Sequence, residues 1–245
     1  MVNFMESRMN RFSYADWRKY FEQNDARRLV IPFENDTLTE EEKELVFPSI
    51  VQFEQGERSE GKHLKKTADL FAGKIHNKDY GYCIRWFIRE ENAHSGYLKA
   101  YMDHYCVRAR EHVVLDQVFR RLRRLAGLRC EVMVLVTAEM IALSYYDALK
   151  DATQSCALKA VCRQMLHDEI PHVMFQSYTL SHFKNPFYVE WLRVLLMEFT
   201  SAVTWLSCRN VFAAAGWTFK KFRHNNLFYL GQSLELSRGR YWKVS

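Results

Sequence analysis

Apolar residues recur at intervals of three and four along most of the chain, and strict alternation is nearly absent. This spacing gathers side chains on one face of an α-helix and therefore predicts an all-helical protein. Ser13 is expected to cap the first helix, and Thr39 with Glu42 has the capping-box spacing that opens the second. The expected helices cover 14–24, about 40–71, 79–105, 111–125, 128–149, 155–179 and 186–214, with a short helix followed by irregular chain after 225.

The domain organisation follows from length and from the even composition of the chain. With 245 residues, the protein can bury a large core, and no composition shift marks a boundary. We therefore expect a single domain over 1–245. Within it we expect a helical bundle at about 45–180, a helix before it, and additional helices at about 186–235.

Cysteine usage and hydropathy bear on the compartment. The six cysteines include no C-x-x-C pair, which excludes a zinc knuckle and favours free thiols in a reducing compartment. The first twelve residues lack the apolar segment of a secretory signal. No stretch reaches the roughly 18 uninterrupted apolar residues of a membrane span. The expectation is a cytoplasmic protein without a membrane-spanning segment.

The formal net charge is +6, and much of the excess lies in basic clusters at 120–129 and 220–240. Such clusters could receive an acidic partner protein, although a solvated helix face is the simpler explanation. Nucleic acid is not expected as a partner, and a homodimer is among the assemblies that the sequence allows.

The most informative feature is a set of glutamates inside apolar helix stripes. Glu91, Glu139 and Glu169 each have apolar residues one and two turns away on the same face. A buried carboxylate must be protonated, ion-paired or bound to a cation. An ion-pair network is the alternative to a metal site, but Arg85 and Arg89 lie off the Glu91 stripe and the Glu139 stripe has no Lys or Arg.

Two of these glutamates are followed by a histidine three residues later, at His94 and His172. Residues three apart share a helix face, so each pair can converge on one ion. A further glutamate precedes each pair by one helical hairpin: Glu139 lies 30 residues before Glu169, and Glu60 lies 31 residues before Glu91. Four carboxylates and two imidazoles can hold two metal ions. Glu57, one turn before Glu60, and Glu54 remain alternatives to Glu60.

These motifs resemble those of the ferritin-like dinuclear-iron carboxylate proteins. The segment 90–94, EENAH, is similar to the E-E-N-x-H motif of acyl-carrier-protein desaturases. The segment 168–172, DEIPH, is similar to the D-E-x-x-H of the desaturases and of ribonucleotide reductase small subunits. The resemblance covers roughly 50–180. It implies a ferritin-like four-helix bundle with additional N- and C-terminal helices around two iron ions, with manganese or a mixed pair as the other choices.

The resemblance also implies roles for individual residues. Glu91 and Glu169 would bridge or chelate the metals, and Asp168 would accept a hydrogen bond from His94. Trp17 is a candidate to continue that hydrogen-bond chain. Tyr145 and Tyr146 lie close enough to Glu139 in sequence to donate a hydrogen bond or carry a radical, although core packing explains them more simply. The implied metal ligands are Glu60, Glu91, His94, Glu139, Glu169 and His172.

The function that the resemblance implies is a di-iron oxidoreductase that activates O₂, as a desaturase or mono-oxygenase does. Its substrate would be small and apolar, free or carrier-bound, and a protein such as a ferredoxin would donate electrons. One alternative is a peroxide- or iron-handling protein like rubrerythrin or ferritin. Another is a helical binding protein with a structural metal site.

Overall fold

The computed structural model describes residues 1–58, 61–108 and 127–239, and all regular secondary structure in these ranges is helical. This confirms the all-helical prediction for the described chain. The predicted helix at 111–125, with its arginine cluster, and Glu60 lie outside these ranges. Two short 3₁₀ helices, Phe4–Glu6 and Arg8–Arg11, precede α1 (Tyr14–Asp25), α2 (Glu40–Glu57), α3 (Lys62–Lys74), α4 (Lys78–His104), α6 (Gly127–Ala152), α7 (Cys156–Ser181), α8 (Phe187–Ala214) and α9 (Phe219–Ser237).

Local capping explains where the first two helices begin. The Ser13 side chain accepts a hydrogen bond from the Asp16 backbone N–H, and Asp16 accepts one from the Ser13 N–H, which completes a capping box. The Thr39 hydroxyl accepts from the Glu42 N–H at 3.2 Å. Both start sites agree with the sequence prediction, because a cap depends on residues within one turn of it.

Two predicted elements differ from the structure. The helix expected over about 40–71 is interrupted, since α2 ends at Glu57 and α3 begins at Lys62. Gly61 has a φ of 61°, in the left-handed region, and a chain in that conformation leaves the helix. The short helix expected after 225 is instead the 19-residue α9, which begins at Phe219.

Gly61→Ala is expected to lower the free energy of unfolding by about 1–3 kcal/mol, from left-handed strain and crowding. A Cβ at this position would lie 2.7 Å from Ile88 side-chain atoms. Gly56→Ala is the matched control, because Gly56 lies in α2 with nothing within 4 Å of an added Cβ. That change should raise stability by about 0.5–1 kcal/mol. Urea unfolding curves measure both, and equal effects would contradict the role assigned to Gly61.

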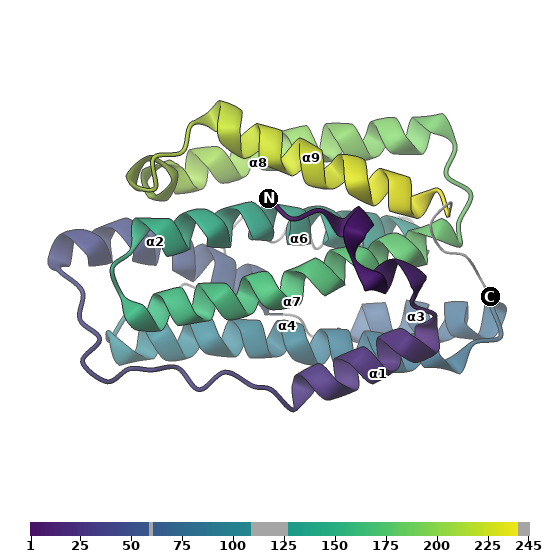
Figure 1. The fold of residues 1–245 in the computed structure, drawn as a ribbon, viewed down its shortest axis with the longest axis horizontal. Coiled ribbons are helices and arrows are strands. Elements are labelled where there is room, and N and C mark those ends of the chain that lie inside the picture. Colours follow the sequence, from purple (N-terminus) through teal and green to yellow (C-terminus); the bar gives the residue numbers. More distant parts are fainter. Residues whose placement is uncertain (59–60, 109–126, 240–245) are drawn as a thin grey trace.

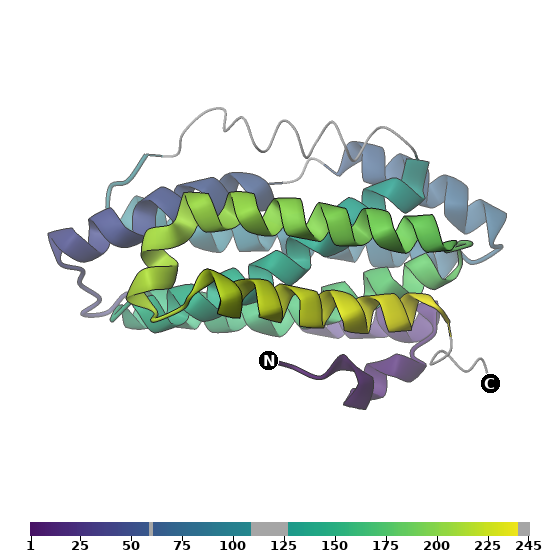
Figure 2. The ribbon, with the colours of Figure 1, turned by 90° about the horizontal axis from the view of Figure 1, so that it is seen from above.

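The helices pack with α4 against α1, α2 and α3 on one side, and α6 against α7, α8 and α9 on the other. Figure 1 shows α8 and α9 side by side at one edge of the molecule and α1 with α4 at the opposite edge. In the view from above, α8 and α9 run along the length of the molecule (Figure 2). Contacts between α4 and α7 and between α3 and α6 join the two halves. The two histidine motifs, on α4 and α7, thus meet in the interior.

Helix α6 is the central apolar helix. Among the described residues, it alone is long and apolar enough to cross a membrane by length and composition. However, 83% of its most apolar window is buried inside the molecule, which is the pattern of a core helix. Glu139 lies within this helix and is buried. Glu139 is therefore a buried carboxylate inside a strongly apolar segment, and the groups around that carboxylate must explain how it is accommodated.

Candidate metal centre

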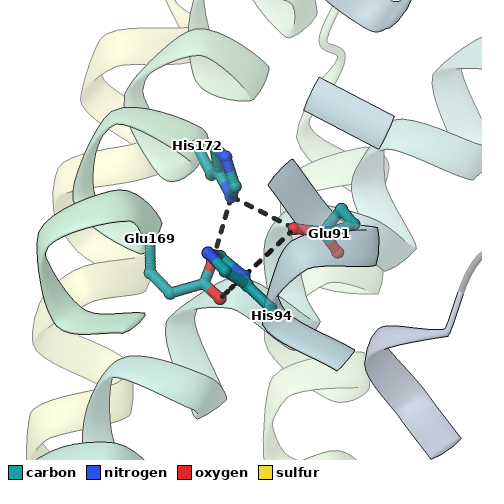
Figure 3. Close-up of side chains that lie close together, drawn as sticks. All are labelled: Glu91, His94, Glu169 and His172. Atoms are coloured by element: carbon teal, nitrogen blue, oxygen red, sulfur yellow. Dashed lines mark hydrogen bonds and ion pairs between the residues drawn. The ribbon is translucent and has the colours of Figure 1, made fainter. Parts of the chain in front are cut away.

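Four side chains from α4 and α7 converge in the interior (Figure 3). Glu91 and His94 come from α4, Glu169 and His172 come from α7, and all four are buried. One ligand atom from each lies within 4.8 Å of the other three. Each pair is brought to one face by its three-residue spacing, and helix packing brings the two faces together. The cluster could hold a metal ion.

The distances show that both imidazoles turn the same ring atom, Nδ1, toward the carboxylates of Glu91 and Glu169. His172 Nδ1 lies 3.2 Å from Glu91 Oε1 and 3.2 Å from Glu169 Oε2. His94 Nδ1 lies 3.3 Å from Glu169 Oε1 and 3.8 Å from Glu91 Oε1. Three of these atoms, Glu91 Oε1, His94 Nδ1 and Glu169 Oε1, are buried without a hydrogen bond in the described structure. Buried polar atoms are normally hydrogen-bonded, so buried atoms that converge on one point without a hydrogen bond are consistent with a cation site.

Two further buried carboxylates border this cluster, Glu57 from α2 and Glu139 from α6. The Tyr146 hydroxyl donates to Glu57 at 2.7 Å. The Gln176 amide donates to Glu139 at 3.0 Å, and the other Glu139 oxygen lies 4.0 Å from His172 Nδ1. The described site thus contains four glutamates and two histidines, contributed by four helices.

The structure bears directly on the alternatives for the first carboxylate. Glu54 is buried, but it accepts hydrogen bonds from Arg58 and from the Ser95 hydroxyl. Glu57 is also buried, its carboxylate accepts from Tyr146, and burial together with the charges of Glu169 and Glu91 raises its pKa. Glu60 lies outside the described residues. Glu57 is therefore the carboxylate that α2 contributes to the described site.

Electrostatics at the site are dominated by buried negative charge. Burial, followed by repulsion from Glu169 and Glu91, raises the pKa of Glu57 and of Glu139 well above the ordinary value. Burial alone would also raise the pKa of Glu169, but its close polar contacts with Glu139, His172 and His94 hold it below the ordinary value. In the absence of another cation, Glu57 and Glu139 therefore tend to remain protonated.

Within the described part of the chain, no Lys or Arg pairs with the four glutamates of the site. Arg58 pairs with Glu54, and Arg89 pairs with Asp25. The partners of Glu57, Glu91, Glu139 and Glu169 are instead histidine, tyrosine and amide side chains. The described residues therefore give no support to the alternative of an ion-pair network with Lys or Arg.

An outer layer of carboxylates orients the two imidazoles. His94 Nε2 lies 3.1 Å from Asp168, as the resemblance implies, and His172 Nε2 lies 2.8 Å from Glu90. A carboxylate only accepts, so both Nε2 atoms donate, and Nδ1 is in each ring the atom that faces the cluster and that a metal ion would take in place of a proton. Asn24 of α1 donates to Glu90 at 2.7 Å and to Asp168 at 2.9 Å. Each motif's first acid thus holds the histidine of the other motif.

Sequence reasoning missed Glu90, Asn24 and Gln176. Glu90 could have been found from the parallel between EENAH and DEIPH, because it stands where Asp168 stands in the second motif. Gln176 lies one helical turn after His172, which also places it on the site face of α7. Asn24 carries no local signal, since its partners are 66 and 144 residues away.

Three aromatic candidates have different surroundings. Trp17 packs against Phe12, Phe21 and Phe175, and its Nε1 has no hydrogen bond in the described structure. The expected link from Trp17 to Asp168 is therefore not observed. Tyr146 donates to Glu57 and so borders the site directly. Tyr145 instead donates to Ser49 at 2.9 Å.

Besides His94, the groups that bond to Asp168 in the described structure are Asn24, His167 and Gln164. These three side chains, rather than Trp17, continue the hydrogen-bond chain from Asp168.

Asp168→Ala is expected to weaken metal binding by about 10–100-fold, because His94 loses the acceptor that orients its ring. Competition with a chromogenic chelator measures the affinity for Mn²⁺ or Fe²⁺. Asp69→Ala is the control, since Asp69 is an exposed aspartate of α3 that pairs with Arg85. Equal affinities for the Asp168 variant and the unchanged protein would contradict the orienting role.

The site is thus an interior set of carboxylates and imidazoles, with its ring orientations fixed by a second set of acids. Its chemistry is that of a centre that could bind a metal ion. Comparison of the chain with protein-family models, with curated proteins and with solved structures found no match.

Proposed function

We propose that the protein is a di-iron oxidoreductase that activates O₂, built on a ferritin-like four-helix bundle. The observation that carries the proposal is the convergence of Glu91, His94, Glu169 and His172, bordered by the two further buried carboxylates. Four carboxylates and two imidazoles match what two iron ions require. The same donor set accepts manganese, so a dimanganese or mixed centre is the variant of the proposal.

The residues present fit such a centre. Glu91 Oε1, His94 Nδ1 and Glu169 Oε1 face the cluster without a hydrogen bond, and these are the atoms that metal ions would take, with loss of the proton from His94. Glu91 and Glu169, which lie between the two imidazoles, would hold the ions together with the histidines, and Glu57 and Glu139 at the border would complete the set of ligands. When bound, two ferrous ions supply the electrons that reduce O₂ and the oxidising power that attacks a C–H bond.

The protein's own groups would control water and protons around the centre. The Phe87 ring packs 4.7 Å from the His172 ring, and Phe21 packs at 6.0 Å. Such a lining keeps water away from the imidazole and suits an apolar substrate. Glu57 and Glu139 have raised pKa values, and they can therefore take up or release a proton as the charge at the site changes. Tyr146 holds Glu57 through its hydroxyl.

The partners belong to the same proposal. An apolar substrate, free or carrier-bound, and an electron donor such as a ferredoxin would complete the reaction. Exposed basic residues at the start of α9, Lys220 and Lys221, offer a contact for an acidic partner.

Oxygen consumption tests the function. Metal-free protein is loaded anaerobically with two equivalents of Fe²⁺ and mixed with O₂-saturated buffer in a stopped-flow instrument. We expect O₂ uptake that is stoichiometric with bound iron and much faster than for Fe²⁺ in buffer. His172→Ala should lose it, and Glu54→Gln, which changes a buried glutamate outside the cluster, should retain it.

Other outcomes separate the competing functions. Two tightly bound irons without accelerated O₂ uptake would contradict the proposal and indicate a structural metal site in a helical binding protein. Oxidation by hydrogen peroxide at a much higher rate than by O₂ would instead indicate peroxide handling.

A further inference from the structure

Helix α8 has an apolar face that no element of the described chain covers. Seven large apolar side chains of α8 are more than half exposed. The first along the helix, Phe187, is 73% exposed, and the last, Leu206, is 71% exposed. They recur at intervals of three and four, apart from one two-turn step to Leu206, and therefore form one stripe along the helix. The members of this α8 stripe are Phe187, Tyr188, Trp191, Leu192, Leu195, Phe199 and Leu206.

The size of the α8 stripe exceeds what a monomer ordinarily exposes. At the exposed fractions of its four aromatic residues, these side chains alone present about 350–600 Å². The largest apolar patch on a typical monomer is about 300–600 Å² in total, and here three leucines add to it. Helix α8 bends at Cys208, whose φ of −118° and ψ of 16° are not helical, and the stripe ends just before this bend. An uncovered face of this extent indicates a protein or lipid contact.

The charges around the α8 stripe indicate which kind of partner could bind it. Between Phe187 and Leu206 the only charged residues are Glu190, Arg193 and Glu198. Arg193 is buried and donates to Ser233 and Ser237 of α9. Both glutamates are also paired, Glu198 with Arg223 of α9 and Glu190 with Arg238, the residue that follows α9. The exposed stripe itself is therefore uncharged.

An uncharged stripe does not suit a charged partner. Neither a nucleic acid nor an acidic protein would find a counter-charge along it. A helix that lies on a membrane carries Lys and Arg on its exposed flanks. In α8 the one cation between Phe187 and Leu206 is buried. The occupant that fits is another uncharged apolar stripe.

A second copy of the chain supplies such a stripe. From Phe187 to Leu206 the stripe is about 28 Å long, at about 1.5 Å per residue. If two stripes pack antiparallel about a two-fold axis near Leu195, the aromatic side chains alone remove about 700–1,200 Å² from water. The leucines bring this into the range of about 1,200–2,000 Å² of stable interfaces. We propose that α8 is the dimer interface of this protein, formed by the α8 stripes of two copies.

Charge insertion at Leu195 tests the interface in the full chain. Leu195 is 59% exposed and lies near the middle of the stripe, so Leu195→Glu leaves the fold intact while placing two like charges across the axis. Light scattering after size exclusion and sedimentation velocity, at about 1–100 μM protein, should show a dimer for the unchanged chain and a monomer for Leu195→Glu. Leu70→Glu is the control, because Leu70 is 69% exposed on α3, and this variant should remain a dimer.

A rescue experiment tests the antiparallel pairing and guards against misfolding. Leu195→Glu and Leu195→Lys should each be monomeric, with unchanged helical circular dichroism, and should form a mixed dimer when combined. A monomeric unchanged chain at 100 μM would overturn the proposal, and so would a dimer that persists in Leu195→Glu. Flotation of the unchanged chain with phosphatidylcholine–phosphatidylglycerol vesicles, as a monomer, would overturn it in favour of a lipid contact.

Discussion

Glu139→Gln is expected to stabilise the metal-free protein and to remove most of the stabilisation that metal ions give. In the metal-free state the buried Glu139 carboxylate lies beside Glu169 and Glu91, and its raised pKa measures the penalty for ionising it. A neutral amide of the same shape removes that penalty and can still accept from Gln176. We expect a gain of about 1–3 kcal/mol in the free energy of unfolding at pH 7.5.

In the metal-loaded protein the same substitution is expected to lower the free energy of unfolding, because the amide is a poor substitute for a carboxylate ligand. A loss of about 100-fold in affinity removes about 2.7 kcal/mol of the stabilisation that bound metal provides. Chemical unfolding with chelator and with saturating Mn²⁺ measures both states of the same variant. Manganese is the better probe here, since Mn²⁺ does not react with O₂ during the measurement.

Glu54→Gln is the matched control for this prediction. Glu54 is as buried as Glu139, but it is satisfied by Arg58 and Ser95 rather than by the cluster. Its replacement should lower stability by about 0.5–2 kcal/mol equally with and without metal, since a satisfied carboxylate is lost in both states. If Glu139→Gln behaves in the same way as Glu54→Gln, the cluster is an ordinary hydrogen-bonded network and the metal proposal is wrong.

Above about pH 6.5 the stability of the metal-free protein is expected to fall, and the stabilisation that bound metal gives is expected to grow. Burial lowers the pKa of His94 and of His172, but hydrogen bonds with carboxylates outweigh it and raise both above the ordinary value. The folded metal-free protein therefore keeps protons that the unfolded chain releases near pH 6.5. This contribution is fully present below that pH and is lost as pH rises through the folded-state pKa.

The raised pKa values of Glu57 and Glu139 act in the same direction, starting near the unfolded carboxyl pKa of about 4.3. Metal binding does the reverse, because metal ions displace these protons and bind more tightly as pH rises. For one proton the slope is about 1.4 kcal/mol per pH unit. Urea unfolding at pH 6.5, 7.5 and 8.5 should show metal-free stability falling while the stabilisation by Mn²⁺ grows. Parallel trends for the two forms would contradict this account.

Much of the site was predictable from the sequence because a helix has a fixed period. Glu91 with His94 and Glu169 with His172 share a face whatever the rest of the fold does. Glu139 could be found because it interrupts the most apolar segment of the chain. Such inferences depend on residues within a turn or two of each other, and the structure agrees with them.

The choice among Glu54, Glu57 and Glu60 was not predictable in this way. It depends on where α2 ends, and that end is linked to the left-handed Gly61 and its contact with Ile88 on another helix. Asn24 was hidden for the same reason, because its partners lie on other helices. Tertiary contacts between helices decide these positions.

Helix α9 was underpredicted because about half of its buried residues are polar. Asn226 is fully buried, donates to Ser201 and accepts from Ser144, and Ser233 is buried against Ser177 and Arg193. Buried polar residues satisfied by neighbouring helices do not produce the apolar periodicity from which a helix is predicted. The sequence from Phe219 therefore resembles a polar tail.

The central claim is that buried acids persist in apolar helix faces because metal ions neutralise them. Crystals of the protein grown with Fe²⁺ or Mn²⁺, with anomalous data collected at both absorption edges, test it most directly. We predict two anomalous peaks between Glu91 and Glu169, each beside one of His94 and His172. A metal-soaked crystal with no anomalous peak there, and with the carboxylates hydrogen-bonded to one another, would contradict the claim.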